Sequence, residues 1–325
     1  MVVRARLVAM QLQKARAQVG ANRMSDTSAE EVPSRIAAER GSDSSHNYSA
    51  VVLYYKLGSS VADTIDALMN QTHPPSNVIV VDNASKDGVL ATVASRRRDL
   101  TVLELDENRG YAGGMNAGAK AIGDSTPLTL FLTHEVVLDP NCLRNLTRGM
   151  SAGKHSLVGP VLKRGTTGKV WSRGGVFTRW GGVKHILDDR SQPEVQWIDG
   201  ACLLVDTAKF RDIRGFDEDY FLYWEDVDVS ARLRTQGTIG CVDTARASQE
   251  TATTPIYFQI RNQILFWRKR GKWVPASLAA AAALAKIFIR DIPHWRIKVI
   301  EARVRGLIDG LTGELNLDLA SLREV

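Results

Sequence analysis

Short apolar runs alternate with amphipathic stretches over the first two thirds of the chain. The apolar runs are rich in β-branched residues, which is typical of buried strands, and they cover residues 49–55, 78–81, 101–105 and 127–135. Helical periodicity fills the intervals between them, at 61–70, at 88–98 and after the Gly-rich loop 107–118. This alternation predicts parallel βαβ units and an α/β domain with a mixed, mainly parallel sheet.

Polar residues follow each predicted strand of this domain. They are Tyr54–Tyr55, Asp82–Asn83, Asn108–Arg109 and Thr133–His134–Glu135. Ligands of such sheets bind outside the carboxyl ends of the strands. We therefore expect these residues to converge along one edge of the sheet.

The pattern changes towards both ends of the chain. From about Ser151 it becomes irregular: residues 174–185 predict hairpins, 197–210 a strand entering a short helix, and 225–236 a helix. Residues 1–47 have the composition of a tail, with a short helical pattern at 7–18. The predicted organisation is a disordered tail at 1–47, one domain at 48–271 and a basic helical extension at 272–325.

Composition is that of a globular protein, with 325 residues, 44% of them hydrophobic and 24% charged. Cys142, Cys202 and Cys241 are far apart and show neither disulfide nor metal spacing, so we interpret them as core residues in a reducing compartment. No secretory signal is visible. The longest apolar stretch, at 278–289, is short and contains Lys286, so we expect no membrane span and a cytoplasmic protein.

The net charge of +6 is concentrated near the C-terminus. Residues 261–305 hold eleven Lys or Arg and two acids, so this segment carries 11 − 2 = +9. Such a segment can meet the phosphates of a membrane, a nucleic acid or a substrate. No nucleic-acid-binding module is recognisable, so we expect no nucleic-acid partner. Ile297, Ile300, Val304 and Leu307 share one helical face, which is typical either of peripheral contact with the inner face of an anionic membrane or of packing on the domain or across a homodimer.

The densest candidate chemistry is the stretch YFLYWEDVDVSARLR at 220–234. Glu225, Asp226 and Asp228 follow a run of aromatics, which makes each charge costlier, as at sites that need a base or a metal ligand. Helical spacing puts Asp226 on one face with Val229 and Leu233, towards the domain, and leaves Glu225 and Asp228 towards solvent. Favourable placement at a helix N-terminus accounts for Glu225 and Asp228, but not for the aromatic run or the orientation of Asp226.

Three further motifs have two interpretations each from their residues alone. Asp82 can accept a hydrogen bond from the imide of a uracil or thymine ring, or shape an Asx turn. The glycines of 107–118 can let a backbone approach an anion at a helix start, or allow tight packing. Glu135 can be a Mg²⁺ or Mn²⁺ ligand at a strand end, or a solvated loop acid beside His134.

The order of these motifs resembles the family 2 glycosyltransferases, with a rhamnosyltransferase-like character. The resemblance covers roughly 49–271 and rests on VVLYY, IVVDNASKDG, ENRGYAGGMNAG, FLTHEVVLDP, IDGACLLV, GFDEDYFLYWEDVDVSARLR and YFQIRNQILFWRKRG. It implies a GT-A fold and inverting transfer of a rhamnose-like or other hexose from a dTDP- or UDP-sugar to an acceptor hydroxyl. The acceptor class it implies is a saccharide, a lipid-linked glycan or a natural product.

The resemblance also implies roles for individual residues. Asp226 is the expected general base, with Glu225 beside it. The residues expected at the nucleotide are Tyr54, Asp82, Asn83, Asn108, Arg109, Gly113 and Asn116. Those expected at the sugar or acceptor are Asp199, Gly200, Tyr223 and Trp224, the aromatics as an apolar wall, with Arg261 as a cation for the leaving diphosphate.

The metal motif departs from the family. The usual aspartate is replaced by Glu135, and Gln249 stands near the place of a metal-binding histidine, so the expected Mg²⁺ or Mn²⁺ ligands are Glu135 and His134. The alternatives are a non-catalytic nucleotide-sugar-binding relative, motivated by this departure, and a nucleotidylyltransferase. The latter needs a Gly-rich loop with Arg and Lys after the first strand, and YYKLGSSVADT lacks it.

Overall fold

The computed structural model describes residues 47–56, 58, 60–97, 100–123, 126–188, 193–249 and 255–315. The predicted tail, except for Asn47, and its helical pattern at 7–18 lie outside the described residues. All the elements below belong to the unit Ser44–Val325.

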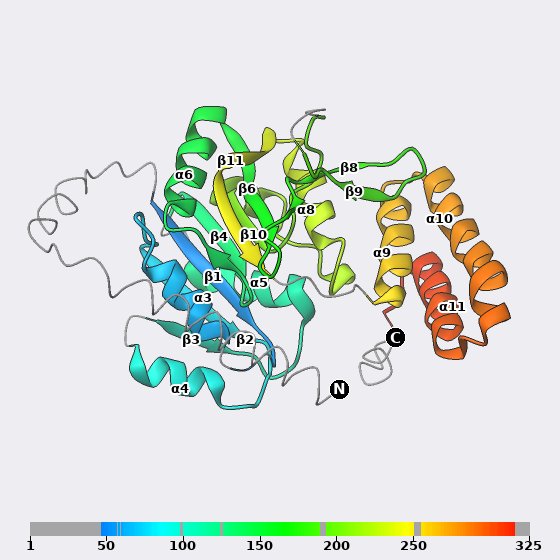
Figure 1. The fold of residues 1–325 in the computed structure, drawn as a ribbon, viewed down its shortest axis with the longest axis horizontal. Coiled ribbons are helices and arrows are strands. Elements are labelled where there is room, and N and C mark those ends of the chain that lie inside the picture. The colour runs from blue at the N-terminus through cyan, green and yellow to red at the C-terminus, as the bar shows by residue number, and fades with distance from the viewer. Residues whose placement is uncertain are drawn as a thin grey trace, which may run out of the picture. The chain divides into compact units, whose positions relative to one another are not determined.

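A nine-stranded mixed sheet forms the centre of this unit (Figure 1). Its order is β3 (Thr101–Glu104), β2 (Asn77–Asp82), β1 (Tyr48–Tyr54), β4 (Leu128–Thr133), β10 (Cys202–Asp206), β6 (His155–Arg164), β11 (Thr238–Gln249) and β5 (Val137–Leu138), with β7 (Val170–Ser172) paired to β6. The first four strands are parallel, and β10 runs antiparallel to β4 and β6. The predicted hairpin is present as β8 (Gly175–Phe177) and β9 (Val183–His185).

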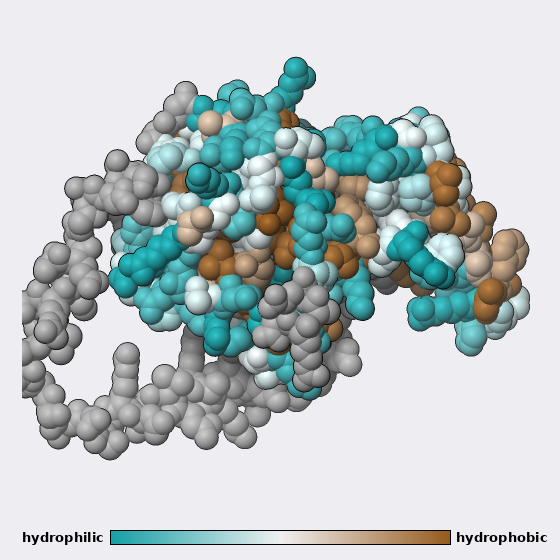
Figure 2. Space-filling view, turned by 90° about the horizontal axis from the view of Figure 1, so that it is seen from above, coloured by the Kyte–Doolittle hydropathy of each residue, from teal (hydrophilic) through white to brown (hydrophobic). Residues whose placement is uncertain are grey.

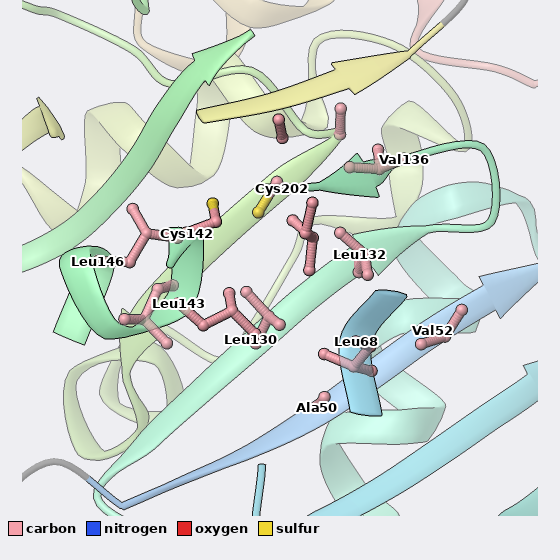
Figure 3. Close-up of a cluster of buried hydrophobic side chains, with 14 of the residues drawn as sticks. Ala50, Val52, Leu68, Leu130, Leu132, Val136, Cys142, Leu143, Leu146 and Cys202 are labelled. Carbon is pink, nitrogen blue, oxygen red and sulfur yellow. The ribbon is translucent and has the colours of Figure 1, made fainter. Parts of the chain in front are cut away.

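Helices cover both faces of the sheet, because side chains alternate across a strand. From β1, Ala50, Val52 and Tyr54 join the cluster with α3 (Ser60–Met69), α4 (Val89–Arg96) and α6 (Cys142–Gly153), part of which Figure 3 shows. Val51 and Leu53 join the opposite cluster with α5 (Gly110–Ile122), α7 (Thr207–Asp212) and α8 (Glu225–Leu233). The predicted α/β architecture is confirmed, and the first of these clusters buries both Cys142 and Cys202 as small core residues.

Two glycines let α5 lie close on the sheet. A Cβ added to Gly114 would lie 2.4 Å from Leu53 Cδ1, and one added to Gly118 would lie 2.3 Å from Val51 Cγ1. The helix also begins at Gly110, inside the predicted loop rather than after it. The glycines of this motif are therefore explained, at these positions, by helix–strand packing.

The C-terminal region is helical, with α9 (Ile256–Lys269), α10 (Trp273–Lys286), the π-helical turn η3 (Ile287–Asp291), the 3₁₀ turn η4 (Ile292–His294) and α11 (Ile297–Thr312). Both α10 and α11 pack against α9. The sequence count found no apolar run of the length of a membrane span, but the helical stretch Trp273–His294, 22 residues, is long and apolar enough to cross a membrane by length and composition alone. The apolar stretch counted in the sequence covered only 278–289, whereas the helical stretch begins before it and continues past it.

Candidate active site

The strand ends converge as predicted. In the parallel register Tyr54 pairs with Asp82 and Leu53 with Thr133, so β1, β2 and β4 end at one edge of the sheet. The antiparallel strand β10 starts at that edge, where Cys202 pairs with Leu132. The Thr133 N–H donates to the Ala201 carbonyl over 3.1 Å, which joins the metal motif to the Asp199–Gly200–Ala201 turn.

Asparagine side chains at this edge hold loops together. The Asn83 amide donates to Asn108 Oδ1 and to the Gly110 carbonyl, both over 2.9 Å, and accepts from the Arg109 N–H. Asn116 donates to the Phe216 carbonyl and to Glu218, and accepts from the Phe216 N–H. These polar groups bond to protein atoms. Asn83, Asn108 and Asn116 therefore hold the loops in position and do not face a ligand.

The other predicted nucleotide residues lie in different surroundings. Tyr54 is fully buried among the α3-side residues, and its hydroxyl donates to Asp87 over 2.6 Å, so its side chain cannot face a nucleotide here. Asp82 is partly exposed and accepts from the Ser85 N–H over 2.7 Å, which is the Asx-type turn. Arg109 forms an ion pair with Glu218 (2.9 Å) across the surface beside Gly113, where an added Cβ would approach both residues.

The N-terminus of α5 is closed by protein atoms. The Phe221 carbonyl accepts from the N–H groups of Tyr111 (2.7 Å) and Ala112 (3.4 Å), and Asn108 Oδ1 accepts from Gly110. A Cβ at Gly110, whose φ is +69°, would lie 2.2 Å from this carbonyl oxygen. These N–H groups are therefore engaged with protein and are not free to bind an anion, and Gly110 is needed for the close approach.

Asp199, Glu225 and Asp226, named here the carboxyl cluster, surround Gly200. Asp226 Oδ2 accepts from the Gly200 N–H over 3.0 Å, and its Oδ1 accepts from the Val227 N–H over 2.8 Å. Asp199 accepts from the Ala201 N–H over 3.0 Å. The Tyr111 hydroxyl donates to the Gly200 carbonyl over 2.6 Å, which brings α5 to the same point.

Burial raises the pKa of all three carboxyls. The pKa of Glu225 rises well above its usual range through burial and the neighbouring Asp226, and its Oε2 is buried with no partner among the described residues. Burial and Asp226 raise the pKa of Asp199 to about 7. Burial also raises the pKa of Asp226, to about 6, but the N–H groups of Gly200 and Val227 stabilise its charged form. Asp226 therefore has the lowest pKa of the three and carries most of the negative charge at neutral pH, where Asp199 is about half ionised.

The predicted orientation of the other α8 acids was wrong. Glu225 and Asp228 are buried, not solvent-facing, whereas Asp226 keeps partial exposure. Asp228 accepts from Arg232 (2.6 Å) and from Arg270 (2.9 Å), which follows α9. Because the α9 region covers the second side of α8, the helix is buried on both sides and a single-face interpretation fails.

The aromatic run before α8 forms a strained loop. Phe221, Tyr223 and Trp224 have φ values of 58°, 67° and 74°, each costing about 1–3 kcal/mol for a non-glycine residue. Asn262 of α9 compensates by donating to the carbonyls of Tyr220, Leu222 and Tyr223 over 2.7–2.9 Å. The loop that leads into Asp226 is thus fixed from the C-terminal helices.

Two predicted roles at this loop need correction. Arg261 is fully buried and donates to the carbonyls of Asp219 and Glu314 and to Asn262, so it does not face a leaving group. Trp224 is buried against Phe266 rather than forming an open wall, while Tyr223 remains partly exposed. The aromatics join α8 to α9, and a sequence pattern cannot show which surface they meet.

The metal motif offers two ligands. His134 donates from Nδ1 to the Leu53 carbonyl (2.8 Å), which leaves the Nε2 lone pair buried, without a partner among the described residues, and 4.0 Å from Glu135 Oε1. Burial lowers the pKa of His134, so the ring is neutral and can coordinate. Among the described residues, no three or more His, Cys, Asp or Glu side chains are placed so that they could hold a metal ion together. The pair fits a divalent ion whose other ligands come from phosphates.

Sequence reasoning missed Tyr111, Glu218 and Asn262. Asn262 carries the one usable signal, since a polar residue on the apolar face of a helix usually has a specific partner. A hollow of about 560 Å³ is lined in part by Lys120, Arg211 and Arg214 beside the second half of α5. Of the predicted site residues it includes Asn116 but none of the carboxyl cluster.

Comparison with known proteins places this geometry in context. The chain is 26% identical over 216 residues to the N-acetylglucosaminyl-diphospho-decaprenol L-rhamnosyltransferase of Mycobacterium tuberculosis, covering 58% of this chain and 70% of the relative. Its fold is similar to the mannosyltransferase PcManGT from Pyrobaculum calidifontis in complex with GDP-Man and Mn²⁺, with TM-score 0.55, 13% identity and coverage of 83% and 88%. It is also similar to GalNAc-T7 with UDP, GalNAc and Mn²⁺, with TM-score 0.57 and 12% identity, covering 68% of this chain and 47% of that one.

The sequence also matches the model of a protein family over residues 49–214, a range that includes β2, β3, β4 and nearly all of β1, as well as α5 and the Asp199–Gly200 turn. The description of that family is glycosyl transferase family 2. The match and the shared fold agree with the motifs at the sheet edge. The chain therefore belongs to glycosyl transferase family 2 and has the GT-A fold.

Proposed function

We propose that the protein transfers a hexose, rhamnose-like in kind, from a dTDP- or UDP-sugar to an acceptor hydroxyl with inversion at the anomeric carbon. The carrying observation is the carboxyl cluster at the carboxyl edge of the sheet, in which Asp226 is the one member with both carboxylate oxygens bonded to backbone N–H groups. Support for the donor class comes from the family and from the Mycobacterium tuberculosis relative, a rhamnosyltransferase.

Asp226 acts as the general base in this proposal. An acceptor hydroxyl has a pKa far above neutral, so it needs a proton acceptor as its oxygen attacks the anomeric carbon from the face opposite the diphosphate. A base whose pKa is about 6 is charged at neutral pH and close enough to it to take a proton effectively. The Gly200 and Val227 N–H groups hold the carboxylate in place.

The neighbouring acids tune this base. Glu225 is buried beside Asp226, and burial together with Asp226 raises its pKa well above the usual range, which favours its uncharged form. Asp199 shares the Gly200 turn and titrates near neutrality. The Tyr111 hydroxyl fixes the Gly200 carbonyl and therefore the turn between the two aspartates.

Glu135 and His134 would hold a divalent ion together with the diphosphate of the donor. When bound, such an ion supplies positive charge to the leaving diphosphate. The chain's own contribution is a neutral His134 ring, fixed by its bond to Leu53, beside an accessible carboxylate. If EDTA leaves transfer unchanged, Glu135 is not a required ligand.

The acceptor in this proposal is a saccharide hydroxyl on a lipid-linked glycan, in glycan or glycolipid biosynthesis. The relative from Mycobacterium tuberculosis acts, by its name, on N-acetylglucosaminyl-diphospho-decaprenol. The similarity covers 58% of this chain and 70% of that relative at 26% identity, so the acceptor is part of the proposal.

The experiment measures transfer and slow donor hydrolysis by the full chain over a panel of dTDP- and UDP-sugars, with NMR of the product's anomeric configuration. We expect inversion, and a loss of about 10²–10⁴-fold in rate for Asp226→Asn, since that is the usual contribution of a general base. The matched control is Asp243→Asn, an exposed aspartate paired with Arg173. Nucleotide binding without any turnover would instead indicate a non-catalytic relative, and retention would contradict the proposed chemistry.

A further inference from the structure

The outer face of the C-terminal helical stretch carries large apolar side chains in water. The most exposed are Val274 (73%), Ile289 (77%) and Trp295 (83%). The full set, named here the apolar face, is Trp273, Val274, Leu278, Leu284, Phe288, Ile289, Ile292, Trp295 and Ile297. Figure 2 shows hydrophobic residues at the surface over these C-terminal helices.

The inner face of α10 is built from small residues, and the large apolar Ile287 is buried only after the end of this helix. Ala276, Ala279 and Ala283 are buried, and they pack with the α9 cluster around Leu265 and Phe266. The arrangement is therefore the reverse of a helix that closes a water-soluble core, where the large apolar residues point inward. Among the described elements, α10 packs mainly with α9, η3 and α11, and the large residues of its outer face stay exposed.

Lysine and arginine side chains lie in the same segment as the apolar face, and its one acidic side chain is buried and paired. Residues 272–300 hold Lys272, Lys286, Arg290, Arg296 and Lys298. Their one acid, Asp291, is fully buried, and Arg303 (2.6 Å) and Arg296 (3.5 Å) pair with it. The surface is thus apolar and positively charged, which complements a bilayer with anionic headgroups.

We propose that the apolar face docks the protein peripherally on an anionic lipid membrane. A second copy of the chain is a poorer partner, because two such faces would bring like charges together around the apolar residues. A transmembrane span is also disfavoured, since Lys286 and Arg290 lie within the stretch and the alanine side is held by α9. Trp273 and Trp295, at its two ends, are residues that favour the headgroup region.

The surface differs from the one that sequence periodicity suggested. The helix α11 was expected to present Ile297, Ile300, Val304 and Leu307 together, but Leu307 is buried and Ile300 partly buried. Gly306 and Gly310 of α11 approach the α9 backbone, where an added Cβ would lie 2.8 and 2.9 Å from the carbonyl oxygens of Tyr257 and Arg261. The membrane surface is therefore formed mainly by α10 and the two turns after it, and α11 packs on α9.

Flotation of the full chain with vesicles tests this docking without any sugar donor. We expect binding to phosphatidylcholine vesicles that contain about one third phosphatidylglycerol, and much weaker binding to phosphatidylcholine alone, because each cation near an anionic surface contributes. The double variant Phe288→Ser with Ile289→Ser should bind about tenfold or more weakly. Its matched control, Trp180→Ser with Leu187→Ser, changes equally large residues exposed by 56% and 55% on the β8–β9 side and should bind as the wild type does.

A charge variant separates the two contributions. Lys286→Glu with Arg290→Glu should lose about tenfold or more on the anionic vesicles while changing little on neutral ones. Exposed cations elsewhere, reversed in Arg148→Glu with Lys184→Glu, are the control. Wild-type flotation by both test variants, or no flotation of the wild type, overturns the proposal. A dimer that the apolar variant converts to a monomer, without vesicle binding, assigns the face to self-association instead.

The membrane-docking proposal and the proposed glycosyl transfer can be contradicted independently of each other. Asp226→Asn should float as the wild type does, and the apolar variant should keep donor hydrolysis in detergent-free buffer. Faster transfer to a bilayer-embedded acceptor than to a soluble one is a further expectation, and this part alone rests on the proposed function.

Discussion

Two groups of polar side chains meet at the carboxyl edge of the sheet and are held in opposite ways. The amide network, which consists of Asn83, Asn108, Asn116 and Asn262, bonds to loop backbone and to neighbouring side chains. The carboxyl cluster gathers three acids around Gly200, where each has a raised pKa. Neutral amides that are fully hydrogen-bonded fix the geometry of loops. Crowded buried acids instead have raised pKa values, which suits them to accept or release a proton near neutral pH.

The amide network and the carboxyl cluster also have different roles: the first fixes the position of the loop, and the second supplies the titratable groups. Asn262 reaches from α9 to three carbonyls of the strained loop, and this loop leads directly into Glu225 and Asp226. The amide network therefore fixes the position of the carboxyl cluster, and the carboxyl cluster determines the acid–base chemistry of the site. Changes to the network should alter stability first, and changes to the cluster should alter pH dependence.

Breaking the network at its buried centre should have the largest effect on stability. Asn262→Ala leaves the carbonyls of Tyr220, Leu222 and Tyr223 without this donor, so we expect a loss of about 3 kcal/mol in the free energy of unfolding. Urea unfolding followed by circular dichroism measures it. The neighbouring Gln263→Ala loses one bond, to the Gly181 carbonyl, and should cost about 1 kcal/mol. Equal losses in the two variants would show that the loop is held by other contacts.

A methyl group at Gly110 should disturb the point where the network meets the strained loop. Gly110→Ala would place a Cβ 2.2 Å from the Phe221 carbonyl oxygen at a φ of +69°, and we expect a loss of about 2 kcal/mol or more. The control Gly123→Ala shares the positive φ (+64°) but has no atom within 4 Å of the added Cβ, so it should cost about 1 kcal/mol. The difference between the two melting temperatures isolates the contact, and no difference would mean that Phe221 moves freely.

Relieving the crowded acids should stabilise the protein by a smaller amount. The pKa of Asp199 is raised to about 7 in the folded state from its ordinary value of 3.8, so the native state binds more protons than the unfolded state between these values. Stability therefore falls as pH rises through this window. Asp199→Asn removes this cost, and we expect a melting temperature a few degrees higher at pH 8 and little changed at pH 4. Thermal melts at both pH values measure it, and a lower melting temperature at pH 8 would contradict a crowded, buried Asp199.

Local sequence patterns foretold much of the sheet and the place of the site. Short apolar runs rich in β-branched residues placed β1, β2 and β4, and their parallel order put Asp82 and Glu135 at the same edge. The orientation of Asp226 towards the domain followed from Val229 and Leu233 of the same helix, and both lie in the core. These features depend on neighbours in the chain, which periodicity captures.

Contacts between segments that are far apart in the chain could not be predicted from the sequence. The burial of Glu225 and Asp228 depends on the region of α9, about forty residues away, which supplies Arg270 to Asp228 over 2.9 Å. The role of Arg261 depends on the carbonyls of Asp219 and Glu314. Nothing in a helical pattern tells which side a second helix will cover, so an amphipathic interpretation assigned these residues to solvent or substrate.

The central claim is that Asp226 is the charged member of the cluster and takes the proton of the acceptor. The pH dependence of the transfer rate at saturating donor tests it most directly, for the wild type, Asp226→Asn and Asp199→Asn side by side. The account predicts a wild-type rate that rises with pH through about 6, a rise that persists in Asp199→Asn, and a low rate without this rise in Asp226→Asn. A rise of normal size and position in Asp226→Asn would contradict it.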